Sequence, residues 1–323
     1  MHLSDLHFGR GANWERQRVL GEDLLRKLST LRTERDVDLL FITGDIAFAG
    51  RSGDYEQATK FVESIRSALH LAVERIFVVP GNHDIDRTVS PTGLAQVRKD
   101  IEGQTPASLP KVLTAATANI IPRQAAYRAW VRDTLKRPTL VATDTTGYRE
   151  TLELSGRPFP VQVIGLDTAW LSGGDDDHER LALNRARLGE LLHDDDGHPL
   201  PGLRLGLCHH PFSWLRDGRE CENLARDHLQ ILFRGHLHQP ELAVQFSPGL
   251  TPLKCVTAGA LFEPSGGDMN YAGFELVDLE LDLTGRPVQA QIHFWGWRGD
   301  FWAPDNHVYP NAANGLVEWK WGS

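Results

Sequence analysis

Five short polar motifs constrain the fold of this chain more than any other feature, because each begins where an apolar strand is predicted to end. They read Asp-Leu-His at 5–7, Gly-Asp at 44–45, Gly-Asn-His-Asp at 81–84, Cys-His-His-Pro at 208–211 and Gly-His-Leu-His at 235–238. Open α/β sheets place their functional residues at the carboxyl ends of strands. We therefore expect the five motifs to converge at one edge of a sheet.

Apolar periodicity predicts alternating helices and strands around these motifs. Leucines at helical spacing over 20–31 precede a buried strand at 37–43, and a second amphipathic helix over 55–69 precedes a strand at 75–79. This alternation is typical of an α/β fold with crossover connections and helices covering the sheet. A further helix is predicted near 181–192, and further strands at 161–166, 203–208, 229–233, 242–246, 253–257, 273–281 and 288–297.

The stretch from about 85 to 160 interrupts this pattern, and we expect it to be an insertion that lies over or beside the sheet edge. It begins with loop-forming residues at 90–93 and then has helical periodicity over 112–121 and 123–135. A substrate-selecting cap, a scaffold patch and a contact surface for a protein partner all fit such an insertion. The residues alone do not separate these three roles.

Composition excludes several classes of protein. Acidic residues outnumber basic ones 43 to 34 and the net charge is -9, which argues against a broad basic face for duplex DNA. The three cysteines form no Cys-x-x-Cys pair, so neither a disulfide framework nor a thiolate zinc site is expected. No apolar run reaches the length of a membrane span, and no secretory signal pattern opens the sequence. These features predict a cytoplasmic protein without membrane contact.

The side chains in the motifs are carboxylates, imidazoles and one amide, which suit divalent manganese, iron or zinc. Two cations held close together repel unless an anionic ligand lies between them, and Asp45 is the natural bridge. A hydroxide between two such metals is a nucleophile at neutral pH, and both ions can clamp a phosphate ester. His83 could then protonate the leaving group as a general acid, with Asp84 orienting its ring.

The five motifs in this order resemble those of the calcineurin-like metallophosphoesterase superfamily, over Met1 to about Leu281. The resemblance implies a four-layer α-β-β-α sandwich of two mixed sheets flanked by helices. It implies one domain over 1–282 that contains the insertion, with 283–323 as a strand- and Trp-rich extension packed on it. It also implies two divalent ions, with Mn²⁺ favoured over iron or Zn²⁺.

The resemblance assigns a role to each motif residue. His83 would be the catalytic acid. His210 would face the substrate or lie behind the metal ligands, because the family's ligand is the first residue after that strand. The first metal would be held by Asp5, His7, Asp45 and His238, and the second by Asp45, Asn82, His209 and His236.

Three departures from the family pattern bear on function. Only Met1 to Ser4 precede Asp5, so either the first strand is short or the chain begins upstream. The protein phosphatases of the superfamily continue Gly-Asp with Asp-Arg-Gly, whose arginine grips phosphate. Here Ile46 and Ala47 follow Asp45, which disfavours a protein phosphatase. Arg87 is a candidate phosphate anchor, although a surface salt bridge fits it equally well.

We therefore expect a binuclear metal-dependent phosphodiesterase acting on a nucleotide or on single-stranded nucleic acid. The alternatives are a phosphomonoesterase or protein phosphatase, and a non-catalytic or partner-gated effector module whose insertion binds another protein. The other histidines are expected to be structural. Interior packing is favoured over stacking on nucleobases for the C-terminal tryptophans, which are Trp295, Trp297, Trp302, Trp319 and Trp321.

Overall fold

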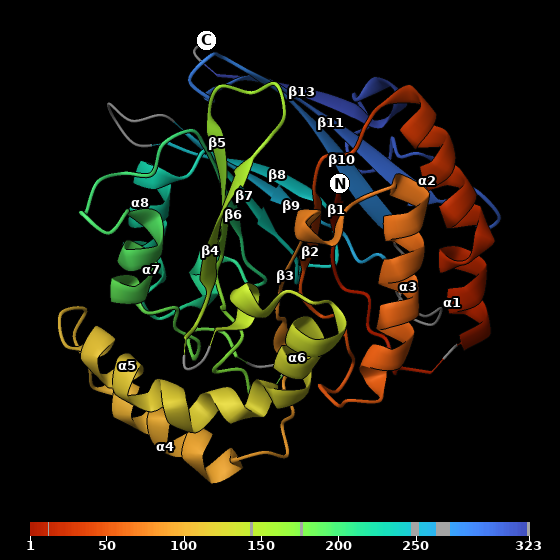
Figure 1. The fold of residues 1–323 in the computed structure, drawn as a ribbon. Helices are drawn as coiled ribbons and strands as arrows, with labels where there is room; N and C mark the ends of the chain where they lie inside the picture. Colours follow the sequence, from red (N-terminus) through yellow and green to blue (C-terminus); the bar gives the residue numbers. More distant parts are fainter. Residues whose placement is uncertain (12, 143–144, 175–176, 247–251, 263–271, 322–323) are drawn as a thin grey trace.

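Two mixed β-sheets lie face to face in the computed structural model, which describes all residues except 12, 143–144, 175–176, 247–251, 263–271 and 322–323 (Figure 1). The first sheet has the order β12-β11-β10-β1-β2-β3, with β13 also paired to β11, and the second has the order β4-β5-β6-β7-β9-β8. Strands β1 to β3 are parallel to one another, as are β5, β6, β7 and β9. The strands of the first sheet are β1 (His2–Leu3), β2 (Leu40–Thr43), β3 (Ile76–Val79), β10 (Gly273–Leu281), β11 (Pro287–Trp297), β12 (Trp302–Pro304) and β13 (Leu316–Lys320). Those of the second sheet are β4 (Tyr148–Glu153), β5 (Pro160–Gly165), β6 (Leu203–Leu207), β7 (Ile231–Arg234), β8 (Glu241–Gln245) and β9 (Leu253–Thr257).

Helices cover the outer face of each sheet, so the predicted four-layer sandwich is confirmed. On the side of the first sheet lie α1 (Asn13–Leu20), α2 (Glu22–Glu34) and α3 (Asp54–Leu69), and on the side of the second lie α7 (Arg185–Leu192) and α8 (Gly218–His228) (Figure 1). One apolar core joins both sheets, because Leu3 and Phe41 of the first pack in the same cluster as Leu205 and Phe233 of the second. Among the described residues, no helix is long and apolar enough to cross a bilayer.

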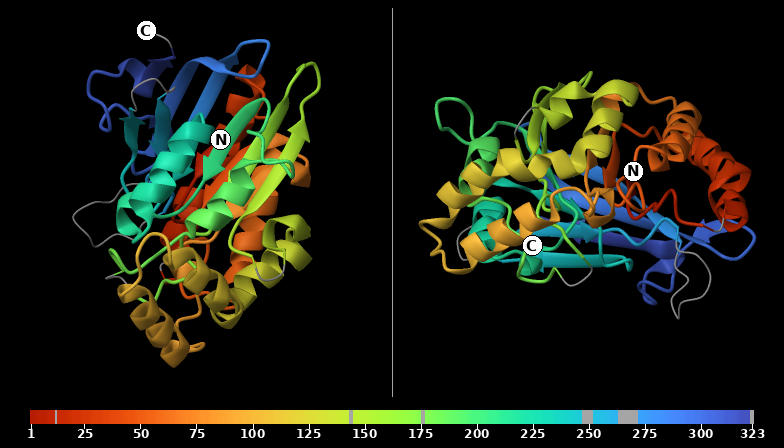
Figure 2. Two further views of the ribbon diagram at one scale, coloured as in Figure 1. Left: turned by 90° about the vertical axis from the view of Figure 1, so that its left-hand side faces the viewer. Right: turned by 90° about the horizontal axis from the view of Figure 1, so that it is seen from below.

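The region from 85 to 160 is mostly helical, and its helices lie along one edge of the molecule, at the bottom of Figure 1 and of the left view of Figure 2. The prediction of a loop at 90–93 was wrong, because α4 begins at Pro91. Proline suits the first position of a helix, where its fixed φ is favourable and its missing N–H costs nothing. The helices are α4 (Pro91–Glu102), α5 (Leu109–Ile120) and α6 (Ala125–Ala129), followed by a π-helical turn (Trp130–Thr134).

Several hydrogen bonds tie this helical region to the sandwich, including one to α3 and one to the segment after β5. The indole Nε1 of Trp130 donates to Thr59 Oγ1 of α3 at 3.0 Å, and Gln124 Nε2 donates to the carboxylate of Asp167 at 2.7 Å. Asp167 follows β5, whose antiparallel neighbour β4 also lies between 85 and 160. The helices are therefore anchored to a helix that covers the first sheet and to the segment that follows β5 of the second.

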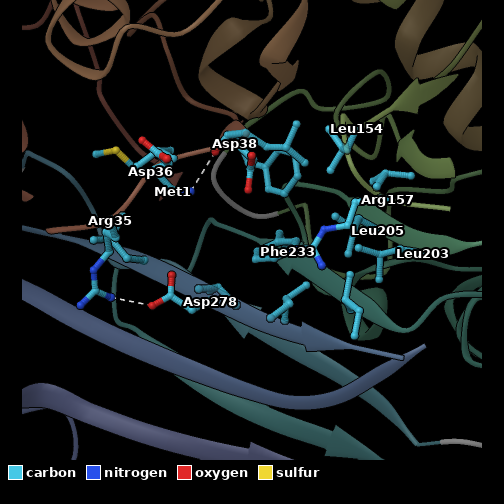
Figure 3. A pocket seen from close by; sticks show the side chains of 18 residues that line it. Met1, Arg35, Asp36, Asp38, Leu154, Arg157, Leu203, Leu205, Phe233 and Asp278 are labelled. Carbon is cyan, nitrogen blue, oxygen red and sulfur yellow. Dashed lines mark hydrogen bonds and ion pairs between the residues drawn. The ribbon is translucent and has the colours of Figure 1, made fainter. Parts of the chain in front are cut away.

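Strand β1 has two residues in the structure and is internal to its sheet. His2 is paired with Phe41 of β2 on one side and with Glu275 of β10 on the other. Beyond this pairing, toward the amino ends of β2 and β6, a cavity of about 230 Å³ opens between the sheets (Figure 3). Leu203, Leu205 and Phe233 line it, and an ion pair between Arg35 and Asp278 lies at its margin. This cavity lies at the end of the strands opposite to the motifs.

Candidate metal centre

The five motifs converge, as the sequence predicts, because each follows the carboxyl end of a strand: β1, β2, β3, β6 or β7. Two groups of side chains offer ligand atoms that lie within 4.8 Å of one another. The first sheet supplies most of one group and the second sheet supplies all of the other. The groups are Asp5, His7, Asp45 and His238, and His209, His210 and His236.

The backbone of this site is strained. Five candidate ligand residues have positive φ angles between 47° and 73°, in the left-handed region that non-glycine residues rarely adopt. Such conformations cost free energy and persist only where the surrounding structure imposes them, and they cluster at functional sites. The five residues are Asp5, His7, Asp45, His236 and His238.

Glycines at the motif turns permit the close approach of these segments. A Cβ atom on Gly44, whose φ is 96°, would lie 2.6 Å from Nδ1 of His209. A Cβ atom on Gly235 would lie 1.9 Å from Oγ of Ser4. Each glycine therefore lets a loop of one sheet touch a loop of the other.

Asp45 lies at the middle of the site and is buried. Its Oδ1 accepts a hydrogen bond from the backbone N–H of His83 at 2.7 Å, and its Oδ2 lies 3.4 Å from Nε2 of His209. Burial alone would raise the pKa of Asp45, but the charge and hydrogen bond of His209 hold that pKa well below its usual value. Burial likewise opposes protonation of His209, yet Asp45 raises the pKa of His209 to about 9. Asp45 is therefore anionic at neutral pH, as a bridging ligand must be.

His209 is oriented by its other ring nitrogen. Its Nδ1–H donates to the carbonyl oxygen of Thr43 at 2.7 Å, which directs Nε2 toward Asp45 and toward Oδ1 of Asn82 at 3.1 Å. Metal-binding histidines commonly donate the N–H that does not face the metal to a carbonyl or carboxylate. The orientation of His209 is therefore that of a metal ligand, with Nε2 directed at the other proposed ligands Asp45 and Asn82.

Several buried atoms of the site have no hydrogen-bond partner. They include both ring nitrogens of His7 and Oδ1 of Asp5, which lies 3.3 Å from Nε2 of His238. Unpaired buried polar atoms are costly, and native proteins contain few of them. Burial lowers the pKa of His7 to about 4, so its ring is neutral and able to coordinate a metal. The residues present therefore fit divalent cations.

His83 lies at the margin of this group and is half-buried. Its Nδ1–H donates to the carbonyl oxygen of Phe48 at 2.7 Å, and its ring is stacked on the Phe48 ring at a centroid distance of 5.1 Å. The His7 ring lies edge-on at 4.9 Å. With Nδ1 engaged, Nε2 is the nitrogen that can exchange a proton with a bound molecule.

Asp84 does not orient the His83 ring, which corrects the role predicted for it. Its carboxylate accepts hydrogen bonds from the backbone N–H groups of Ile46, Ala47 and Gly81 and from the Tyr55 hydroxyl, at 2.8–3.1 Å. Burial, followed by the charge of Asp45, raises the pKa of Asp84 to about 6. Asp84 thus fixes the turns that carry Asp45 and Asn82, while the Phe48 carbonyl orients His83.

His210 and Arg87 were predicted to contact the substrate. His210 is buried, its Nδ1 and backbone N lie 3.1 and 3.0 Å from the Thr168 hydroxyl, and its Nε2 has no hydrogen-bond partner. It can reach the same point as His209 and His236, but the contacts with Asp45 and Asn82 belong to His209. Arg87 is half-buried in the turn before α4. Substrate binding by these two residues stays a prediction.

Sequence reasoning missed two residues that shape the site. The indole of Trp214 packs edge-to-face on the His236 ring, with centroids 4.2 Å apart. Arg16 is buried, and its guanidinium donates to the carbonyl oxygens of His7 at 2.7 Å and Arg10 at 3.0 Å. The available signal for Trp214 was that an aromatic residue follows the Cys-His-His-Pro motif by three positions. Arg16 had none, because its hydrogen-bond acceptors are backbone atoms.

The sandwich and its ligand set define a metal-dependent phosphoesterase class. The sequence profile of the calcineurin-like phosphoesterases matches residues 1–240, and the chain belongs to that family.

Individual relatives are distant. The chain is 22% identical to the uncharacterized metallophosphoesterase-like protein YydB of Bacillus subtilis (strain 168), in a match covering 99% of this chain and 64% of that protein, so it spans less than two thirds of its relative. A hypothetical protein from Thermus thermophilus has a TM-score of 0.42 at 14% identity, covering 99% of this chain and 98% of the other. The NAD nucleotidase NadN of Haemophilus influenzae also has a TM-score of 0.42, at 12% identity, covering 94% of this chain and 48% of the other.

Proposed function

We propose that this chain is a binuclear metal-dependent phosphodiesterase that acts on a nucleotide or on single-stranded nucleic acid. The observation that carries the proposal is the convergence of carboxylate and imidazole ligand atoms, several of them without a hydrogen-bond partner, beside His83, whose Nδ1 is held by the Phe48 carbonyl. A structural metal site has no need of such a proton donor.

Two divalent cations complete this site in the proposal, with Mn²⁺ favoured. One would be held by Asp5, His7, Asp45 and His238, and the other by Asp45, Asn82, His209 and His236. When bound, the cations supply positive charge that polarises a phosphate ester and favours nucleophilic attack on phosphorus.

Residues of the chain supply the proton transfer and the positioning of the ligands. His83 transfers a proton from Nε2 to the leaving oxygen, while its Nδ1–H stays on the Phe48 carbonyl and keeps the ring in place. Asp84 holds the turns around Asp45 through three backbone hydrogen bonds. A ligand geometry fixed before substrate arrives lowers the reorganisation that the reaction requires.

A diester is favoured over a monoester by the residues after Asp45. Ile46 and Ala47 are fully buried and their backbone N–H groups are bound by Asp84, so these positions present no cation to a phosphate. A phosphomonoester carries nearly two negative charges at neutral pH, whereas a diester carries one. A site that lacks the phosphate-binding arginine of the Asp-Arg-Gly triplet therefore suits the substrate with less negative charge.

The test is turnover of bis-p-nitrophenyl phosphate against p-nitrophenyl phosphate, on metal-stripped protein with manganese added back. The expected result is manganese-dependent cleavage of the diester in preference to the monoester. Cleavage of the monoester alone would instead support the phosphatase alternative. Two bound metals with no cleavage of either ester would support a non-catalytic or partner-gated module.

The role of His83 has its own test. His83→Ala should lower turnover of diphenyl phosphate by roughly 10²–10⁴-fold, and should lower that of bis-p-nitrophenyl phosphate less, because p-nitrophenolate leaves readily without a proton. Manganese binding, measured by titration calorimetry, should be unchanged. Equal losses on both esters would show that His83 is not the proton donor.

A further inference from the structure

The loop after His7 carries an arginine that the proposed mechanism does not use. We propose that Arg10 binds a second phosphate of the substrate, on the side of the leaving group, so that the preferred substrate is a nucleotide chain and not an isolated phosphodiester. This inference rests on the proposed function and deepens it.

Arg10 shares an aromatic ring with the proposed proton donor. Its guanidinium carbon lies over the Phe48 ring, 5.2 Å from the centroid, and the same ring is stacked on His83. A guanidinium stacked on an aromatic ring gains cation–π attraction and keeps its N–H groups directed outward. Arg10 is exposed, so these N–H groups are accessible to a ligand.

The backbone that presents Arg10 is fixed at several points. Buried Arg16 donates to the carbonyl oxygens of His7 and Arg10, and its guanidinium lies between the rings of Phe8 and Phe262, at 5.1 and 4.5 Å. The backbone N–H of Arg10 itself donates to the His7 carbonyl at 3.3 Å. The position of Arg10 relative to the metal centre is therefore set before a ligand binds, which reduces the entropy that binding costs.

Charge identifies the ligand as an anion. Within the part of the chain that the structure describes, no carboxylate forms an ion pair with Arg10, although acidic residues outnumber basic ones in the sequence. An unpaired guanidinium is well suited to bidentate recognition of phosphate oxygens. The aromatic support and the absent carboxylate are two separate observations that favour the same ligand.

The position of Arg10 identifies which phosphate it binds. His83 is proposed to protonate the leaving oxygen, so groups that surround His83 face the leaving group. Arg10 lies against the same Phe48 ring, and a phosphate within its reach would belong to the departing part of the substrate. In a polynucleotide, the departing part carries further phosphates. In a simple diester it carries none.

The experiment measures how well thymidine oligonucleotides compete with bis-p-nitrophenyl phosphate on the manganese-loaded protein. TpT has one phosphate, and TpTpT has a second, with a statistical advantage of about twofold that needs no extra contact. One charge-assisted hydrogen-bonded contact should make TpTpT about tenfold the stronger competitor of wild-type protein. Arg10→Gln should reduce this ratio to about twofold, and Arg10→Lys should leave an intermediate ratio because the charge remains.

Arg132→Gln is the matched control, since Arg132 is an exposed arginine on the π-helical turn, paired with Asp133, and its loss changes the net charge equally. It should keep the tenfold ratio. The inference is wrong if wild-type protein prefers TpTpT no more than twofold, or if Arg10→Gln keeps the preference. If wild-type protein hydrolyses no ester, the proposed function fails. The binding ratio of fluorescein-labelled TpT and TpTpT, measured by anisotropy, then judges Arg10 separately.

Discussion

The two ends of the sandwich are built from the same strands but differ in the side chains that they bury. At the carboxyl ends, polar side chains without hydrogen-bond partners are held by left-handed backbone turns. At the opposite end, a cavity of about 230 Å³ is lined by apolar side chains together with the charged residues Arg35, Asp36, Asp38, Arg157 and Asp278, and Asp278 is paired with Arg35 (Figure 3). The presence of a cavity is therefore a poor indicator of the catalytic site. Buried polar atoms without partners and strained backbone conformations are better indicators.

One substitution, aspartate to asparagine, can test this contrast at four positions, because it removes charge with little change of shape. Asp45→Asn should have the largest effect. A neutral amide cannot offset the repulsion between two cations, so turnover should fall by roughly 10³-fold or more. Bound manganese, measured by atomic absorption, should fall from two ions per chain to at most one. Two retained ions with full turnover would contradict the bridging role.

Asp84→Asn should chiefly lower stability. The amide NH₂ would face backbone donors that the carboxylate now satisfies, at a cost of about 2–3 kcal/mol in the free energy of unfolding. Tyr55→Phe removes only one of these hydrogen bonds and should cost about 1 kcal/mol. Urea unfolding of metal-free protein measures both. Equal costs for the two variants would show that the backbone contacts contribute nothing.

Asp167→Asn should change how stability depends on pH. Burial raises the pKa of Asp167 from 3.8 to about 6, so the folded state binds this proton more tightly than the unfolded state. The free energy of unfolding should therefore fall as pH rises from about 4 to about 6, by about 2 kcal/mol for this group.

The Asp167→Asn side chain does not titrate, so the variant lacks this pH-dependent fall in the free energy of unfolding. Its stability relative to wild type, measured by urea titration, should therefore be greater at pH 7 than at pH 5. The buried Oε1 of Gln124, which has no hydrogen-bond partner, could accept from the new amide after a flip of the Gln124 side chain. A stability difference that is constant between the two pH values would show that Asp167 does not titrate in this range.

Asp278→Asn, at the opposite end, should have the smallest effect. The two side chains of the Arg35–Asp278 pair are 29% and 45% exposed, and such pairs contribute about 0–1 kcal/mol. The loss should shrink further in 1 M salt, because screening weakens exposed charges. Turnover should be unchanged. A tenfold or larger drop in turnover, about 1.4 kcal/mol or more in the activation free energy, would show that the two ends are coupled.

The sequence predicts the location of the site better than its internal hydrogen bonds. Polar motifs directly after apolar runs locate Asp45 and His209, because strand periodicity can be read locally. The partners of His83 and Arg16 are carbonyl oxygens of segments such as Phe48 and His7, and every residue carries a carbonyl. No pattern of residue types could identify them. The helix at Pro91 was missed for a related reason, since proline both begins helices and occurs in loops.

Each proposed metal position takes ligands from both layers of the sandwich. Asp5, His7, Asp45 and Asn82 come from loops of the first sheet, and His209, His236 and His238 come from loops of the second. A bound ion would then be a crosslink between layers that otherwise meet through apolar contacts and through hydrogen bonds such as that from His209 to the Thr43 carbonyl. Sliding of one sheet over the other would break coordination bonds, so the metals would fix the relative position of the two halves of the protein as well as serve its chemistry.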